Sequence, residues 1–146
     1  MSLLEEQKRI ARRCLEAISE KDFSIIDTCY DPGYVRHDPD SPQVRSREEY
    51  RKYLMGLCAV FPDLHFTVDD VFGEGDQVVC RFSITGTHKL PWRGLPATGK
   101  QVNLTGINIS KMAGNKVVED WFNTDIFSLA LQLGLIPMPA PASAPK

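Results

Sequence analysis

The fold is decided by residues 77–124, QVVCRFSITGTHKLPWRGLPATGKQVNLTGINISKMAGNKVVEDWFNT. Alternating apolar and polar side chains predict three strands here, over 77–88, 101–112 and 116–124. Gly114 and Asn115 form a short turn between the last two strands, which must therefore pair antiparallel. A loop rich in proline and glycine, from Leu90 to Gly99, separates the first two.

The segments before this stretch predict one more strand and two long helices, besides a short helix after Asp22 and a brief extended piece from Tyr34 to Pro39. Residues 65–72 alternate imperfectly and reach the next strand through a tight turn at 73–76, which contains two glycines. Apolar residues at helical spacing predict amphipathic helices over 3–18 and 47–61. Ser46 and Glu49 have the spacing of a capping box at the start of the second helix.

The segment after the strands predicts a final helix from Ile126 to Leu133, with Gly134 suited to its C-terminal end. Helices followed by an antiparallel sheet are typical of an α+β fold, in which three helices cover the concave face of a bent sheet. Residues 1–136 are expected to form this domain. The tail, 137–146, is rich in proline and alanine and is expected to be disordered.

Composition excludes several classes of protein. The formal net charge is -2, from 17 basic and 19 acidic residues, without the basic surface typical of a nucleic-acid or membrane binder. The chain begins without an apolar signal region and has no run long enough to span a membrane, so we expect a cytoplasmic protein. Its four cysteines form no CxxC pair and are expected to be free thiols packed as small apolar side chains.

Several motifs resemble the SnoaL-like polyketide cyclases, within the wider superfamily of nuclear transport factor 2 and ketosteroid isomerase. These motifs span nearly the whole chain apart from the tail: His37-Asp38-Pro39, Gly86-Thr87-His88, Gly94 to Lys100, Gly106 to Ile109, Val117 to Trp121, Asp125, and Leu129 to Gly134. The resemblance implies a cone-shaped curved sheet that encloses a pocket. Because this fold supports many functions, it identifies the family better than the chemistry.

The resemblance also implies a mechanism. In characterised polyketide cyclases, a pocket aspartate acts as acid and base in an intramolecular aldol ring closure, without a metal or an organic cofactor. Asp125 matches that aspartate by its position before the last helix. Asn108 stands where those enzymes have a histidine, which weakens any prediction of the same substrate.

Asp125 has two interpretations. In an apolar cavity, desolvation would raise its pKa and make it a useful base near neutral pH. Alternatively, it caps the final helix. Strict alternation places Trp121 and Asn123 on the same strand face as Asp125, and this face is expected to bind a flat, oxygen-bearing ligand. The alternative is that Trp121 belongs to the core and Asn123 to a frayed strand end.

Three further polar residues are candidates. His37 and His88 are candidate catalytic groups that would polarise a carbonyl or relay a proton, or else they are a turn residue and a solvated strand-end residue. The scattered histidines have no metal-ligand spacing, so no metal site is expected. Arg81 suggests a second class, since epoxide hydrolases of the superfamily activate water with an Asp-Arg-Asp set. Without a bulge, Arg81 and His88 must face opposite sides of the sheet.

These observations lead to one main functional hypothesis. We expect a small, mostly apolar carbonyl compound in the cone, walled by Tyr53, Phe61 and Trp92, with aldol or proton-transfer chemistry. The rival is a domain of the same fold that only binds a ligand or dimerises. A homodimer is expected through the open sheet face, where Val79, Val102 or Ile107 would form an apolar patch, depending on register.

Overall fold

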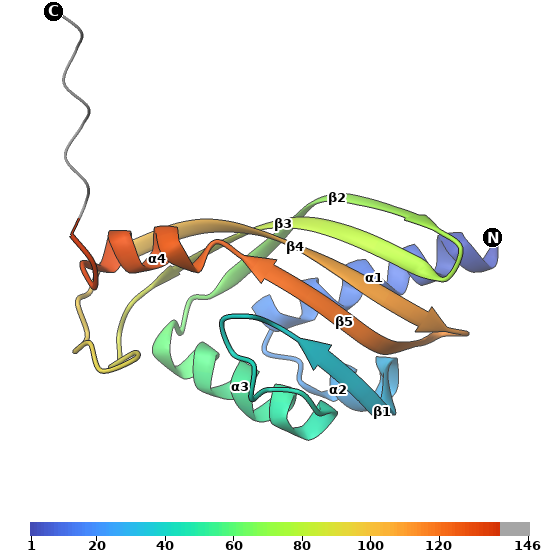
Figure 1. The fold of residues 1–146 in the computed structure, drawn as a ribbon, viewed down its shortest axis with the longest axis horizontal. Coiled ribbons are helices and arrows are strands. Elements are labelled where there is room, and N and C mark those ends of the chain that lie inside the picture. The colour runs from blue at the N-terminus through green and yellow to red at the C-terminus, as the bar shows by residue number, and fades with distance from the viewer. Residues whose placement is uncertain (138–146) are drawn as a thin grey trace, which may run out of the picture.

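The computed structural model describes residues 1–137, so most of the tail expected at 137–146 lies outside the described residues. Five strands form one curved sheet, with most of the helices beneath it (Figure 1). The elements are α1 (Leu3–Ser19), α2 (Ser24–Cys29), β1 (Tyr30–His37), α3 (Arg47–Val60), β2 (His65–Glu74), β3 (Gln77–Thr87), β4 (Gln101–Ala113), β5 (Lys116–Thr124) and α4 (Ile126–Leu133). The predicted α+β fold is confirmed.

The sheet order is β1-β5-β4-β3-β2. The hairpins β2–β3 and β4–β5 and the β3–β4 pair are antiparallel, as expected. β1, however, pairs parallel with β5, so the sheet is mixed and the prediction of a wholly antiparallel sheet was wrong at this edge. More than 80 residues of chain separate the paired residues of β1 and β5. No turn in the sequence therefore indicates that these two strands pair.

The helix ends follow the sequence signals. At the start of α3, the Glu49 amide donates to Ser46 Oγ (3.1 Å) and the Ser46 amide donates to Glu49 Oε1 (3.0 Å). Gly134 ends α4 with φ of 82°, a left-handed conformation that glycine adopts without strain. The capping box and the C-terminal glycine are confirmed.

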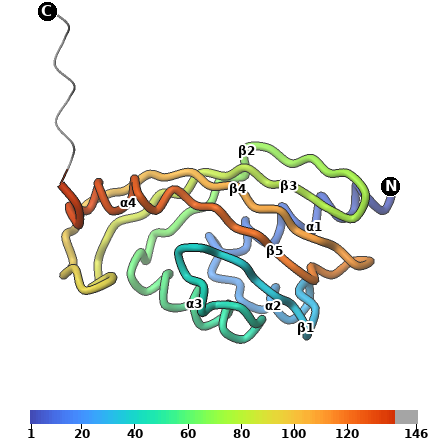
Figure 2. The backbone as a smooth tube through the Cα atoms, in the orientation of Figure 1, coloured from blue at the N-terminus to red at the C-terminus, as the bar shows by residue number. Residues whose placement is uncertain are grey.

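The core lies between the inner face of the sheet and the helices. α1 packs chiefly against β2 and contributes Ala11, Leu15 and Ile18, all buried. The chain trace in Figure 2 shows α1, α2 and α3 on the same side of the sheet. The opposite face, called here the outer face, is uncovered in the described structure.

A β-bulge decides which side chains of β5 face inward. Met112 pairs with Val117 but Lys111 pairs with Glu119, so β5 has one extra residue, Val118. Such an insertion reverses the alternation of every later side chain. Asp120 and Phe122 are therefore buried on the inner face, whereas strict alternation from Val117 predicts the reverse.

Candidate functional site

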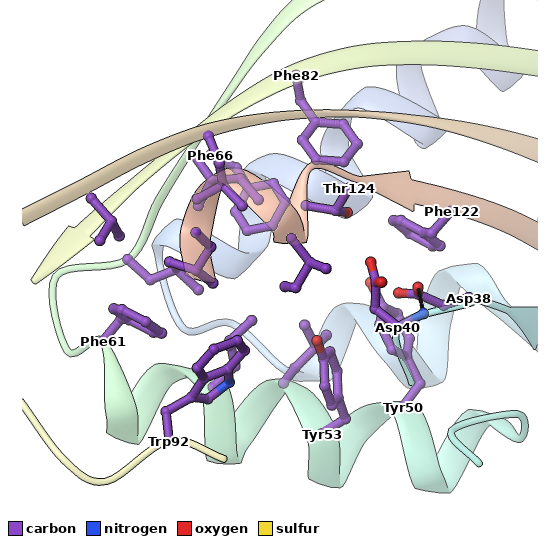
Figure 3. A pocket seen from close by; sticks show the side chains of 18 of the residues that line it. Asp38, Asp40, Tyr50, Tyr53, Phe61, Phe66, Phe82, Trp92, Phe122 and Thr124 are labelled. Atoms are coloured by element: carbon purple, nitrogen blue, oxygen red, sulfur yellow. Dashed lines mark hydrogen bonds between the residues drawn. The ribbon is translucent and has the colours of Figure 1, made fainter. Parts of the chain in front are cut away.

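A cavity of about 70 Å³ lies between the inner face of the sheet and α3. Most of its lining is apolar. Figure 3 shows Phe61 and Trp92 at one end and Asp38 and Asp40 at the other. Tyr53 and Thr124 contribute polar groups to this lining. An apolar chamber with a few polar groups at one end is typical of a small-molecule site.

Arg36, on β1, is the fixed positive charge of the polar end. Its Nη2 donates to Asp38 Oδ2 (2.7 Å) and its Nη1 to Ser41 Oγ (3.0 Å), and both charged side chains are at most 4% exposed. The guanidinium also lies 4.8–5.0 Å from the ring centres of Tyr50, Tyr53 and Phe122. These contacts hold the guanidinium in one place, and Asp38 offsets part of its charge.

Asp40 is the carboxylate available for chemistry. It lines the cavity and is only partly buried, and no hydrogen bond or ion pair to its carboxylate is found within residues 1–137. Desolvation, followed by the nearby Asp38 charge, raises the pKa of Asp40 above its ordinary 3.8. A carboxylate that is partly dehydrated and has no partner is a better base than one in water.

The loop between β3 and β4 closes the apolar end. Within it, the amide of Trp92 donates to the Leu95 carbonyl and the Leu95 amide to the Trp92 carbonyl, both at 2.9 Å. Arg93 lies over the Trp92 ring at 4.7 Å and donates from Nη2 to the Asp40 carbonyl oxygen at 2.6 Å. The loop therefore connects the apolar end of the cavity to the segment that positions Asp40.

A buried polar cluster around Asp120 lies on the inner face of β5, beyond the cavity lining. Asp120 is 1% exposed, and it accepts hydrogen bonds from the Tyr34 hydroxyl (2.7 Å) and the Ser110 hydroxyl. Asn108 Nδ2 lies 3.5 Å from the same carboxylate. Burial raises the pKa of Asp120 to about 6, although these hydrogen bonds oppose the shift.

Asp125 lies outside the cavity, contrary to the expectation from strand alternation. It is exposed and caps α4, where its Oδ1 accepts from the Ser128 amide at 3.1 Å. Trp121 and Asn123 also face the outer side. The bulge at Val118 is the physical reason, because it turns this set outward and Phe122 and Thr124 inward.

The other predicted residues divide among three places. Tyr53, Phe61 and Trp92 line the cavity, as expected. His37 lies on the outer side, bonded to Glu119 (2.7 Å) and stacked on Trp121, and Arg81 is exposed near Asp70. His88 and Asn108 are buried on the inner side. Arg81 and His88 therefore face opposite sides of the sheet, with Arg81 on the outer face.

His88 supports the loop. Its Nδ1 accepts from the Thr98 amide (3.2 Å) and lies 2.9 Å from the Thr98 hydroxyl, while its backbone bonds to Gly99 and Lys100. Its Nε2 is buried without a partner in the described part of the chain. His88 therefore joins the start of the loop to its end, through its side chain at Thr98 and its backbone at Gly99 and Lys100.

Sequence reasoning missed Arg36, Asp40 and Asp120. The first two belong to a short edge strand and the polar loop after it, where no periodicity assigns a face. The signal for Asp40 was the pair of acids two residues apart in HDPD, next to a strand end. Among the described residues, no group of three or more potential metal ligands occurs, and none of the helices has the length and apolar character to span a bilayer.

Comparison with known proteins gives consistent results. A family model described as SnoaL-like polyketide cyclase matches residues 8–133. A candidate polyketide cyclase from Acidithiobacillus ferrooxidans has 31% sequence identity and a TM-score of 0.81, covering 92% of this chain and 99% of that one. IdmH from Streptomyces antibioticus has 29% identity and a TM-score of 0.78, covering 89% and 99%. TsrD from Streptomyces laurentii has 28% identity and a TM-score of 0.80, covering 90% and 97%. No curated protein matches the sequence.

Proposed function

Because the chain belongs to the SnoaL-like polyketide cyclase family, we propose that it binds a small, mostly apolar carbonyl compound in the cavity and catalyses aldol or proton-transfer chemistry there. An aspartate acts as acid and base, and no cofactor takes part. The observation that supports this proposal best is the Asp40 carboxylate, which lines an apolar cavity without a bonding partner among residues 1–137 and has a raised pKa.

The proposed steps use groups of this cavity. Asp40 removes a proton from the carbon next to a ligand carbonyl, and the electron pair moves to the carbonyl oxygen. The resulting enolate carbon attacks a second carbonyl of the same ligand, forming a C–C bond. Asp40 then returns the proton to the new alkoxide, so that it ends the cycle ionised.

Nearby donors support the charge that develops. The hydroxyls of Tyr53 and Thr124 belong to the cavity lining, and the Arg36 guanidinium provides a positive potential at the same end. Donors fixed before the reaction stabilise an enolate oxygen more than the neutral carbonyl. The apolar end, with Phe61 and Trp92, would receive the rest of the ligand.

The test compares Asp40→Asn with Asp125→Asn in the full chain. A fluorogenic aryl β-hydroxyketone serves as the probe, since its retro-aldol cleavage releases a fluorescent aldehyde. We expect Asp40→Asn to lower the rate by about 100-fold or more, because the base is lost while the shape is kept. Asp125→Asn should leave the rate unchanged, since asparagine caps a helix about as well as aspartate.

Two results would contradict the proposed chemistry. One is equal turnover by wild type and Asp40→Asn. The other is saturable binding of the probe, followed by tryptophan fluorescence, without turnover by wild type; this outcome would support the rival hypothesis of a binding domain. The pH–rate profile is a further check, since the rate should rise through a midpoint above the ordinary 3.8 of an aspartate.

A second candidate function is water activation for attack on an epoxide. It is favoured by an Asp-Arg-Asp set in the cavity wall, formed by Asp38, Arg36 and Asp40 rather than by Arg81 and Asp125. In this case Asp40 takes a proton from water, the oxygen attacks an epoxide carbon and the C–O bond breaks, and Asp40 returns the proton to the released alkoxide to give the diol. An apolar aryl epoxide in ¹⁸O-labelled water should then yield a diol with one labelled oxygen, and the absence of diol would exclude this candidate.

A further inference from the structure

The guanidinium of Arg36 has a hydrogen-bond donor that nothing in the described structure uses. The side chain lines the cavity and is 3% exposed. Its Nη1 and Nη2 donate to Ser41 and Asp38, but its Nε is buried without a hydrogen-bond partner among residues 1–137. Buried donors in folded proteins nearly always have a partner. An unpaired donor on a residue of the cavity wall therefore indicates a place for an acceptor that a ligand brings.

The other contacts of Arg36 indicate what kind of acceptor this is. Three rings, those of Tyr50, Tyr53 and Phe122, have their centres 4.8–5.0 Å from the guanidinium carbon. A ring face attracts the cation but accepts a hydrogen bond much more weakly than an oxygen does. The Nε–H group is thus the free donor of a charged group, and such donors bond most strongly to an oxygen anion.

Asp38 connects this donor to the base of the proposed reaction. Its Oδ2 accepts from Arg36 Nη2 at 2.7 Å, and its Oδ1 accepts from the Asp40 amide at 2.9 Å. Figure 3 shows Asp38 and Asp40 at the same end of the cavity. With Asp40 ionised, the lining has one positive and two negative side chains, which oppose the entry of an anion. A proton on Asp40 removes one of the two negative charges.

We propose that the polar end of the cavity binds ligands with an ionisable oxygen, a carboxylic acid or an acidic enol, whose anion accepts from Arg36 Nε–H while Asp40 holds the proton. This inference rests on the proposed use of the cavity as a ligand site. From a neutral ligand, the proton moves from the ligand O–H group to the Asp40 carboxylate. For a ligand that is already ionised, the proton comes from water. No oxidant or further reactant is needed in either case.

The ligand oxygen reaches Nε only when the cavity widens. The Nε atom is out of contact with solvent, and the present volume of about 70 Å³ is too small for most ligands. Tyr53 is the half-buried member of the three rings around the guanidinium. Movement of its side chain would open the approach to Arg36 without breaking the ion pair with Asp38.

The proton on Asp40 makes binding of an anion depend on pH. Desolvation and the Asp38 charge raise the pKa of Asp40 above its ordinary 3.8, while Arg93 and Arg36 oppose the shift. A bound anion raises it further. The affinity for an anion should therefore fall by about 10-fold per pH unit near neutral pH, because each complex takes up one proton that the free protein lacks.

Other titratable side chains also face this end of the cavity. Burial raises the pKa of each tyrosine near Arg36, which keeps them neutral in this range; these are Tyr34, Tyr50 and Tyr53. Asp120, which interacts with Arg36 through its charge, has a pKa of about 6 and titrates in the same range. An Asp40 variant is therefore needed to assign the proton.

The experiment is calorimetric titration of the full chain with phenylacetate and phenylacetamide. The two probes have the same shape and the same phenyl group, but only phenylacetate carries a charged oxygen. At pH 5.5 we expect phenylacetate to bind at least about 10-fold more tightly, because it forms a charge-assisted hydrogen bond. Titrations at pH 7 in buffers of different ionisation enthalpy should show uptake of about one proton with phenylacetate and none with phenylacetamide.

Variants assign the two roles. Asp40→Asn should bind phenylacetate without proton uptake and with an affinity that no longer falls as pH rises. Asp125→Asn, outside the cavity, is the matched control and should retain the uptake. Arg36→Met combined with Asp38→Asn removes both charges of the buried pair, so that neither is left unpaired. This double variant should lose the preference for phenylacetate; if it does not fold, the two probes and Asp40→Asn still decide.

Binding and proton uptake are the readouts, so this inference and the proposed function can fail separately. Equal affinity for the two probes at pH 5.5, including no binding of either, would overturn the inference even if Asp40 is the base for the ketone probe. Proton uptake that persists in Asp40→Asn would overturn it as well. Conversely, preferential phenylacetate binding with proton uptake would support it even in a protein that does not cleave the β-hydroxyketone.

Discussion

Asp120 is a carboxyl group in a place where ionisation is costly. It is fully buried, and Tyr34 and Ser110 together provide only two close donors. The nearby Asn108 Oδ1 accepts no hydrogen bond in the described structure. A proton on Asp120 would therefore add a donor to a cluster in which one acceptor has none. Burial, which these donors only partly oppose, raises the pKa of Asp120 to about 6.

This shift predicts how the stability of the fold depends on pH. The folded pKa, about 6, lies above the ordinary 3.8, so the unfolded chain loses this proton first as pH rises. Protonated Asp120 therefore contributes fully to the free energy of unfolding below about pH 4. This contribution falls between about pH 4 and pH 6 and is absent at higher pH, a total loss of up to about 3 kcal/mol. Asp120→Asn should remove that decrease.

The measurement is urea unfolding of wild type and Asp120→Asn between pH 4.5 and 7.5. Because other groups also titrate in this range, the quantity of interest is the difference between the two free energies of unfolding. We expect that difference to move in favour of Asp120→Asn as pH rises through the window. Parallel pH profiles would show that Asp120 has an ordinary pKa.

At the scale of elements, the loop between β3 and β4 forms part of the cavity wall through Trp92. The present volume, about 70 Å³, is well below the roughly 300 Å³ of a site for a drug-sized ligand. Ligand entry therefore requires side chains at the apolar end to move. We expect the loop to move, because its Trp92 side chain forms part of the cavity wall. The hydrogen bond from Arg93 to the Asp40 carbonyl oxygen would hold the loop in its present position.

Arg93→Ala should loosen this loop. Losing one hydrogen bond and one ring contact would speed hydrogen exchange of the Trp92 and Leu95 amides by roughly 5- to 10-fold. Lys89→Ala, an exposed substitution in the same loop, is the matched control and should leave both amides unchanged. Equal exchange in all three proteins would mean that Arg93 does not hold the loop.

The elements also show what the sequence can and cannot predict. The hairpins were predictable because glycine-rich turns join adjacent strands, and α3 because Ser46 and Glu49 form a local capping box. The β1–β5 pairing and the bulge at Val118 were not, since both depend on contacts between distant segments. The bulge explains why the polar set at Asp125 was assigned to the wrong face, and why Asp120 escaped notice.

On the scale of the whole molecule, the outer face carries an apolar stripe in register. Phe72, Val79, Ile109 and Trp121 are successive cross-strand partners on β2, β3, β4 and β5. Phe72 is 57% exposed and the neighbouring Ile107 is 48% exposed, whereas Val102, also considered for this patch, is buried on the inner face. A stripe of this kind across an uncovered sheet is typical of a surface that another protein covers.

We propose that a second copy of the chain covers this stripe, giving a homodimer. Ile109→Lys would place a charge in the middle of the stripe, where burial against a partner is costly, and should convert the dimer to a monomer. Met55→Lys, at an exposed apolar position on α3, is the matched control and should leave the dimer intact. Sedimentation equilibrium at micromolar concentration distinguishes the species, since one chain is 16.4 kDa. A wild-type protein that sediments only as a monomer, or a Met55→Lys variant that dissociates as readily as Ile109→Lys, would contradict this assignment.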